Sequence, residues 1–186
     1  MKRSIVYITV ILILLAVITV LLVTSCREEP PDEVFFEEEE LLISAYLEEH
    51  ADKYSSLIRV LEITDLKKTL NAYGNYTFFA PDNDAFNDFC AQYGKSSVEE
   101  FDVDYLVTLV RYHLIDIEIE SSYFRDGVIP DTTYSGDYLV ITFSEGGLET
   151  IHVNDAMITE RDIQVENGII HSIDKVLDPI IGSIFG

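Results

Sequence analysis

The four histidines are the first side chains in this sequence to consider for chemistry, because imidazole serves as a metal ligand and as a general base. No two of them are four residues apart, and no cysteine lies close to any of them. Zinc sites need ligands at short, regular spacings. The spacing therefore predicts no metal site and no cofactor, with a metal site assembled from distant residues as the alternative. The histidines are His50, His113, His152 and His171.

The sequence also has no clear motif for a nucleophilic serine or for a calcium-binding loop. No Gly-x-Ser-x-Gly motif is present, and the only serine next to a histidine, Ser172, should point to the opposite face of a strand from His171. The stretch DNDAF begins like a calcium loop but lacks the glycine and the distal glutamate of that loop. We therefore expect Asp82 or Asn83 to cap a helix, and we expect the protein not to be an enzyme.

The stretch VENGIIHSIDKVLDP, residues 165–179, brings four further polar or turn-forming positions together. Asn167 and Gly168 separate two apolar runs, which predicts a type I′ hairpin turn because both central positions need positive φ. His171 alternates with isoleucines and is expected to be a hydrogen-bonded, partly buried imidazole. Asp174 is placed to accept from backbone amides at the end of the strand. This pattern predicts that the stretch closes the fold and performs no reaction.

The amino-terminal residues predict where the protein is located. A Lys2-Arg3 start precedes an apolar run of 19 residues, and the run ends in Thr24, Ser25 and Cys26. This pattern predicts a signal peptide over residues 1–25, and its ending resembles the bacterial lipobox, in which the cysteine takes a lipid. A signal core is usually about 7 to 15 residues long, so an uncleaved membrane helix is the alternative. Both interpretations place the rest of the chain outside the cytoplasm.

Residues 26–35 are predicted to be the lipidated cysteine and an acidic tether, because prolines and charges suit an extended spacer. Arg27, Glu28 and Glu29 resemble the signal by which some Gram-negative bacteria send lipoproteins to the cell surface. The alternative is a solvated spacer without a sorting role. The expected location is therefore the outer membrane at the cell surface, with the periplasmic face as the alternative.

Composition restricts the class of partner. The chain has 12 basic and 34 acidic residues, a net charge of -22, which disfavours nucleic acid because its phosphates repel an acidic surface. The hydrophobic fraction of 48%, with 11 tyrosines and 10 phenylalanines, is too high for a disordered acidic chain. If Cys26 carries lipid, Cys90 has no disulfide partner, and its helical spacing from Phe86 predicts a buried side chain.

The hydrophobic pattern changes along the chain. Apolar residues at steps of three and four predict short helices over residues 36–71 and again between residues 82 and 113. The stretch YTFFAP, residues 76–81, predicts a strand between these helical regions. Ile115, Ile117 and Ile119 alternate with acidic residues, which predicts a half-exposed strand. Further β segments continue to residue 174, so the pattern predicts an α+β domain over residues 36–186.

Three stretches together resemble the fasciclin domain, a cell-adhesion module. They are YTFFAPDNDAF at 76–86, RYHLID at 111–116 and NGIIHSIDKVLDP at 167–179, and their order and spacing match over about residues 37–180. The resemblance implies a single fasciclin-like domain, an antiparallel β-wedge of about seven strands with several short helices packed around it.

The resemblance also implies positions for partner binding. Animal members contact integrins through an acidic-isoleucine motif before the closing signature and through a Tyr-His pair. The matching positions here are Asp162 with Ile163, and Tyr112 with His113. The alternative for each pair is structural: Asp162 turns the chain, Ile163 packs on the sheet, and Tyr112 and His113 belong to the core. The stretch departs from the animal motif at Arg161 and Gln164.

These features lead to one main functional hypothesis and two alternatives. The main hypothesis is a non-catalytic surface lipoprotein, anchored in membrane lipid by its acylated amino terminus, which mediates adhesion or contact with an extracellular protein or glycan. The first alternative is an accessory glycan- or peptide-binding subunit of an outer-membrane nutrient transporter. The second alternative is an enzyme with a site formed by loops.

Overall fold

A computed structural model of the protein describes residues 13–15, 41–144 and 150–179. Residues 13–15 are helical, and the predicted lipid site at Cys26 and the tether lie outside the described residues. Over the three described ranges, no helix combines the length and the apolar content that crossing a bilayer requires. The fold described below is that of the body from residue 41 onward.

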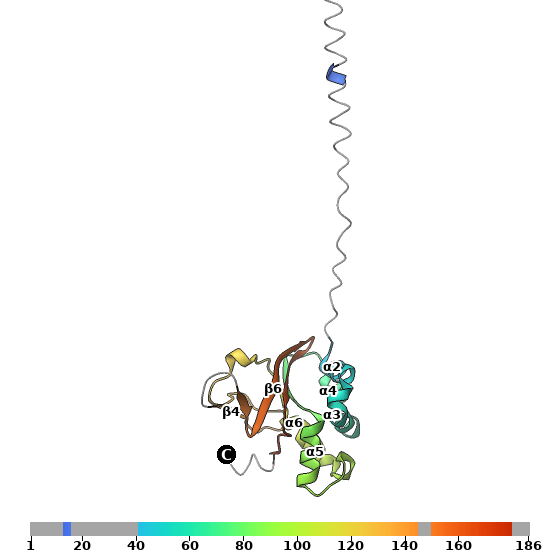
Figure 1. The fold of residues 1–186 in the computed structure, drawn as a ribbon, viewed down its shortest axis with the longest axis vertical. Helices are drawn as coiled ribbons and strands as arrows, with labels where there is room; N and C mark the ends of the chain where they lie inside the picture. The colour runs from blue at the N-terminus through green and yellow to red at the C-terminus, as the bar shows by residue number, and fades with distance from the viewer. Residues whose placement is uncertain (1–12, 16–40, 145–149, 180–186) are drawn as a thin grey trace, which may run out of the picture. The chain divides into compact units, whose positions relative to one another are not determined.

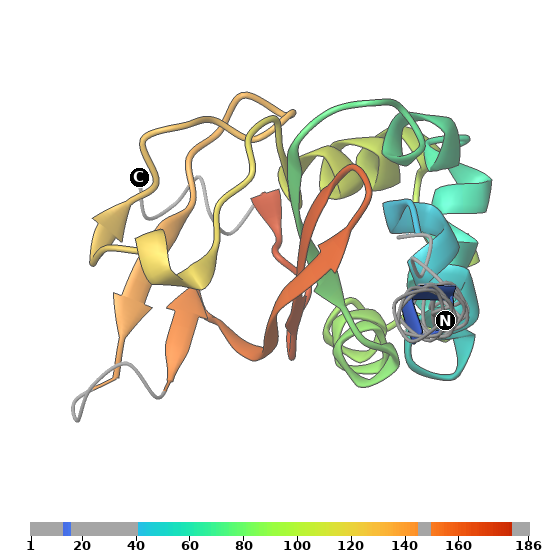
Figure 2. The ribbon, with the colours of Figure 1, turned by 90° about the horizontal axis from the view of Figure 1, so that it is seen from above.

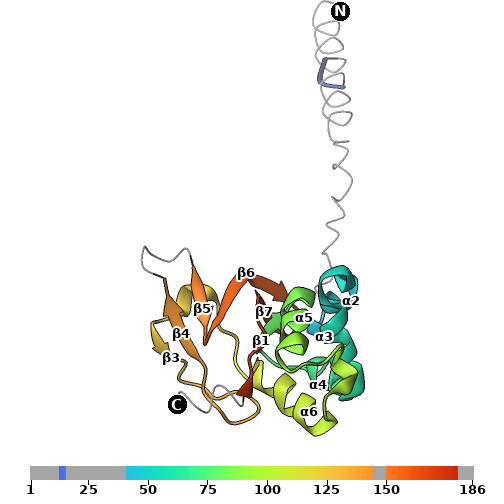
Figure 3. The same cartoon turned by 60° about the horizontal axis from the view of Figure 1, so that its bottom comes forward.

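Within residues 41–144 and 150–179, five α-helices precede or interrupt the sheet, and they gather at one end of the body (Figures 1 and 3). Short helices are present before residue 71 as predicted, and α3 buries Tyr54, Leu57 and Leu61 on one face, as its helical period requires. Asp82 caps α5 as expected, because its carboxylate accepts a hydrogen bond from the Ala85 amide at 2.8 Å. The helices are α2 (Ile43–Glu49), α3 (Ala51–Ile63), α4 (Lys67–Leu70), α5 (Asn83–Gln92) and α6 (Val103–Tyr112), with 3-10 turns η1 (Val98–Glu100) and η2 (Ser121–Tyr123).

Seven strands form one sheet in the order β2-β1-β7-β6-β5-β4-β3, which confirms the α+β class and the strand number (Figure 3). The sheet is not wholly antiparallel, because β1 and β7 pair in parallel from Tyr76 with Gly168 to Pro81 with Ile173. The other neighbouring pairs are antiparallel. The strands are β1 (Tyr76–Pro81), β2 (Leu114–Ile115), β3 (Gly127–Val128), β4 (Val140–Phe143), β5 (Ile151–Val153), β6 (Ala156–Val165) and β7 (Gly168–Ile173).

The strand predicted through Ile117 and Ile119 is wrong beyond its first residue. β2 ends at Ile115, and the hydroxyl of Thr77 takes over the next two backbone contacts. That hydroxyl donates to the Ile117 carbonyl at 2.6 Å and accepts from the Ile119 amide at 2.8 Å. The Thr77 side chain of β1 therefore bonds to the backbone groups that strand pairing would otherwise use, and the chain leaves the sheet after Ile115.

The central pair of strands separates two hydrophobic cores. Every residue of β1 and β7 is buried, as expected for parallel strands covered on both faces. Along β1, Phe78 and Ala80 face the core beneath the helices, whereas Phe79 faces the core enclosed by β4, β5 and the loops around them. Figure 2 shows the helices and the outer strands on opposite sides of this pair.

The junction of β6 and β7 departs from the predicted turn. Val165 pairs with Gly168, so the two loop residues are Glu166 and Asn167, and the type I′ turn at Asn167-Gly168 is wrong. Of that pair only Gly168 has positive φ, at 148°. A Cβ on Gly168 would lie 2.0 Å from the Tyr76 carbonyl oxygen, so this position has room only for hydrogen. The glycine therefore serves the close approach of β1 and β7.

The side chain of Asn167 holds the helices on this junction. It is 1% exposed, and its Oδ1 accepts from the Ile43 amide at 2.9 Å. Its Nδ2 donates to the carbonyls of Leu70 at 2.8 Å and Ala72 at 3.0 Å. One buried amide therefore satisfies backbone groups at the start of α2 and after α4, which would otherwise be unpaired.

We expect Asn167→Ala to lower the free energy of unfolding by about 2 to 4 kcal/mol, because it leaves buried backbone groups without partners. Urea denaturation of the purified protein measures the effect. Asn87→Ala, at an exposed position of α5, is the matched control and should change stability by less than about 0.5 kcal/mol. Equal losses in the two variants would contradict the role given to Asn167.

Candidate functional site

Asp162 lies on a bulge of β6, where the register with β7 shifts between Glu160 and Ile163. Its φ of 61° is in the left-handed region that residues other than glycine seldom adopt. Its carboxylate accepts from the Ser121 amide at 2.6 Å and from the Ser121 hydroxyl. Its own amide donates to His171 Nδ1 at 3.2 Å. Asp162 therefore turns the chain and joins β6 to η2 and β7.

Hydrogen bonds and burial determine the protonation states of Asp162 and His171. Burial would raise the pKa of the Asp162 carboxyl, but the two donors of Ser121 outweigh it and lower that pKa. His171 is 0% exposed, and burial lowers its pKa. Its Nε2 donates to the Ile119 carbonyl at 2.9 Å, so Nδ1 is free of hydrogen and accepts from Asp162. The imidazole is therefore neutral, with both nitrogens in use.

Serine, aspartate and histidine meet here, but their connections differ from those of a nucleophilic triad. A triad needs the serine hydroxyl on the histidine and the carboxylate on the other ring nitrogen. In this protein the Ser121 hydroxyl bonds to Asp162, and both nitrogens of His171 bond to backbone groups. The arrangement holds three segments together and lacks the serine–histidine hydrogen bond of a triad.

The other residues of the acidic-isoleucine stretch are also engaged in the fold. Ile163 is half-buried and packs against the helical core. Glu160 accepts a salt bridge from Lys53 of α3 at 2.8 Å, although a partly exposed ion pair adds little stability. Partner binding through Asp162 and Ile163 stays a prediction.

Tyr112 and His113 are each 2% exposed at the end of α6. The Tyr112 hydroxyl accepts from Asn154 Nδ2 at 3.0 Å. His113 Nδ1 donates to the Leu109 carbonyl at 2.8 Å, and its Nε2 accepts from the Leu177 amide at 2.9 Å. Burial lowers the pKa of His113 to about 4. His113 therefore docks the carboxy-terminal segment on α6, Tyr112 holds the turn between β5 and β6, and the pair offers almost no surface to a partner.

Sequence reasoning missed a buried carboxylate bound by two tyrosines. Asp178, in the last signature, is 8% exposed and accepts from the Tyr105 hydroxyl at 3.1 Å and from the Tyr93 hydroxyl. Burial, together with the contact with Asp178, raises the pKa of both phenols. The two tyrosines lie 85 and 73 residues before Asp178 in the chain, so no local pattern could indicate this contact.

The remaining candidate residues have structural partners. The ring of His50 stacks on Tyr46 at 4.1 Å between centroids, and His152 Nε2 contacts the Ser144 hydroxyl at 3.2 Å. Asp174 accepts from the Met157 amide at 2.7 Å, as predicted for the strand end. Cys90 is buried, as expected. Among the residues that the structure describes, no three histidine, cysteine or acidic side chains are grouped to hold a metal ion.

The exposed aromatic side chains of the described residues are all tyrosines. Three of them come from residues 116–138, which we call the tyrosine segment. Tyr123 is 69% exposed and Tyr138 is 56% exposed, and the segment also exposes Val128 at 60%. Tyrosine is enriched in protein interfaces because it combines a large apolar ring with a polar end. This segment is therefore the candidate contact surface.

The chain is similar to proteins of one family. The family model described as the fasciclin domain matches residues 52–179. Protein sll1483 of Synechocystis sp. is 30% identical over 128 residues, which are 69% of this chain and 68% of that protein. Human periostin is 31% identical over 68% of this chain, and fasciclin-like arabinogalactan protein 15 of Arabidopsis thaliana is 31% identical over 74% of it. This chain spans only 15% and 30% of those two proteins.

A solved structure has the same fold. It is a FAS1 domain pair from the insect cell adhesion molecule Fasciclin I, with a TM-score of 0.52 and 18% sequence identity. The similarity covers 66% of this chain and 45% of that one. At this identity the match establishes the shared fold alone.

The neutral state of His113 predicts a pH dependence of stability. The His113 imidazole has a pKa of about 6.5 in the unfolded chain and about 4 in the folded chain. Its contribution to the unfolding free energy is therefore fully present above pH 6.5 and is lost as the pH falls toward 4. Between pH 7 and 4.5 the wild type should lose about 2 kcal/mol more unfolding free energy than His113→Gln, in which this group cannot titrate. Parallel slopes for the two proteins in urea denaturation would contradict this prediction.

Proposed function

Because this chain belongs to the fasciclin domain family, we propose that it is a non-catalytic adhesion module that a lipid on Cys26 holds at the outer cell surface. Its partner is an extracellular protein on a neighbouring surface. The insect structure with the same fold comes from a cell adhesion molecule, which supports this kind of role. The lipobox-like ending of the leader supports the anchor.

One observation carries the proposal: the buried polar side chains of the closing signature form their hydrogen bonds inside the fold. Asn167, His171 and Asp178 are each less than 9% exposed, and each has hydrogen-bond partners within the body. A catalytic or transport site would need such groups to face a substrate. Their use inside the fold supports a function that depends on the surface.

The tyrosine segment is the surface we assign to the partner. Val128 pairs with Val140, two residues beyond Tyr138, so Val128 and Tyr138 share the outer face of β3 and β4. Leu139 and Ile141, which alternate with them, are buried. The segment contains six acidic residues and a single basic residue, Arg125. A partner with a basic surface would complement this charge and associate faster at low salt.

The proposed lipid anchor holds the body at the membrane. Several acyl chains on the amino-terminal cysteine, at about 0.8 kcal/mol per buried methylene, hold a protein on a bilayer where a single chain would not. The acidic stretch that follows Cys26 acts as a spacer of residues that favour extended chain. The folded body is then free to reach a second surface.

We expect the wild-type protein to begin at Cys26 and to take up an alkyne analogue of palmitate when cells are labelled. Cys26→Ala should take up no label and retain residues 1–25, because lipid attachment at the cysteine precedes removal of the leader. Gel fluorescence and mass spectrometry of the amino terminus report both properties. An unlabelled wild type that retains residues 1–25 would instead indicate an uncleaved membrane helix.

The double variant Tyr123→Ser, Tyr138→Ser should reduce attachment of producing cells to a fixed layer of neighbouring cells by about tenfold, as loss of aromatic contacts in an interface predicts. Surface amounts of each variant are matched by antibody staining. Tyr73→Ser, at a tyrosine that is 91% exposed but lies outside the segment, is the control and should attach like the wild type. Unchanged attachment of the double variant would exclude the tyrosine segment as the contact surface.

A further inference from the structure

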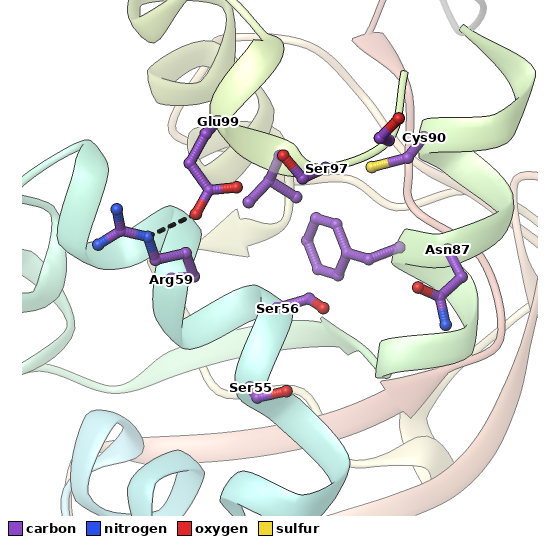
Figure 4. A pocket seen from close by; sticks show the side chains of 10 residues that line it. Ser55, Ser56, Arg59, Asn87, Cys90, Ser97 and Glu99 are labelled. Carbon is purple, nitrogen blue, oxygen red and sulfur yellow. Dashed lines mark hydrogen bonds and ion pairs between the residues drawn. The ribbon is translucent and has the colours of Figure 1, made fainter. Parts of the chain in front are cut away.

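A polar pocket of about 220 Å³ lies between α3, α5 and η1 (Figure 4). α3 contributes Ser56 and Arg59, and α5 contributes Asn87 and Cys90. Figure 4 shows these side chains and that of Glu99 arranged around one hollow. No residue of this pocket belongs to the tyrosine segment, so the inference goes beyond the proposed adhesion role.

The charged side chains at the pocket are paired with each other, which disfavours an ionic ligand. Arg59 Nε donates to Glu99 at 2.8 Å, and its terminal nitrogen donates to Glu62 at 3.0 Å. The guanidinium therefore has no unbalanced charge for an anion, and the net charge of -22 repels one further. Both carboxylates are already paired, so a cation gains little as well. A neutral ligand fits these electrostatics.

The hydrogen-bonding groups at the pocket favour a ligand that carries hydroxyl groups. Within the described residues, the Ser56 hydroxyl and the Asn87 side-chain amide have no protein partner. Each of these side chains can both donate and accept. A ligand hydroxyl has the same dual capacity, so a ligand with several adjacent hydroxyls can pair with both. The Ser97 hydroxyl, which bonds to Glu99, extends this polar rim.

The inner wall and the size limit the ligand to one ring. Phe86 and Val98 line the pocket and are 2% and 6% exposed, so a small apolar area meets the ligand beneath the polar rim. Pockets for drug-sized molecules occupy about 300 to 1,000 Å³, and this one is smaller. A single pyranose has an apolar face, a rim of hydroxyls and no charge, and it matches each of these properties.

We propose that this pocket binds one neutral sugar ring, either a free monosaccharide or the terminal residue of a glycan. The Ser56 hydroxyl and the Asn87 amide hold its hydroxyls, and Phe86 and Val98 contact its ring. So small a ligand in a partly open site binds with a Kd of about 1 mM.

Cys90 provides a reporter of occupancy because it lines the pocket and is 6% exposed. The full-length protein in detergent is treated with N-ethylmaleimide, and peptide mass spectrometry follows alkylation at Cys90 separately from Cys26. Glucose, galactose, mannose and N-acetylglucosamine are tested at 50 mM, with glucuronate as the charged counterpart. At least one neutral sugar should slow alkylation of Cys90 threefold or more, with saturation, and glucuronate should not.

Variants of the pocket residues test whether the sugar that protects Cys90 from alkylation is bound in this pocket. Ser56→Ala and Asn87→Ala should abolish this protection, with the protection of each variant measured against that variant's own alkylation rate without sugar. Gln92→Ala, at another exposed position of α5, is the control and should retain it. Protection by methyl glycosides and disaccharides would indicate a glycan end, whereas protection by free sugars alone would indicate a monosaccharide.

Two results would overturn the proposal: no neutral sugar slows the reaction, or Ser56→Ala and Asn87→Ala are protected as well as the wild type. This measurement does not involve adhesion, so loss of attachment in the tyrosine variants and absence of sugar protection are separate outcomes.

Discussion

The parallel contact between β1 and β7 is the constraint on which the rest of the structure depends. Gly168 brings β7 so close to the Tyr76 backbone that no other residue fits, and Asn167 next to it holds the helices through three hydrogen bonds. The contact joins β7, the last strand of the sheet in sequence order, to β1, the first, so the segments between them in the sequence must fold back to allow this pairing. Both hydrophobic cores form against this pair because each strand is buried on both faces.

Buried polar groups give this fold its specificity, because each must find a particular partner or remain unpaired at a cost in stability. His113 receives the carboxy-terminal segment, His171 and Asp162 join β6, β7 and η2, and Asp178 receives two tyrosines. These contacts connect segments that are far apart in the chain. The buried polar residues of the family signatures therefore maintain the shape of the domain.

The two surfaces proposed for binding differ in chemistry. The tyrosine segment combines exposed aromatic rings with acidic side chains, which suits a large basic partner. The pocket between α3 and α5 is small, balanced in charge and rich in hydroxyl and amide groups, which suits a neutral sugar. The two proposed surfaces share no residue, so the proposed protein partner and the proposed sugar do not compete for one site.

The sequence alone determined the α+β class, the helix cap at Asp82, the buried state of Cys90 and the structural use of Asp174, because these follow from local periodicity and short-range hydrogen bonding. Tertiary structure decided the parallel pairing of β1 with β7, the shifted turn at Glu166 and Asn167, and the end of β2 at Ile115. It also brought Tyr93 and Tyr105 to Asp178 and formed the pocket. Each of these depends on contacts between residues tens of positions apart, which no local pattern records.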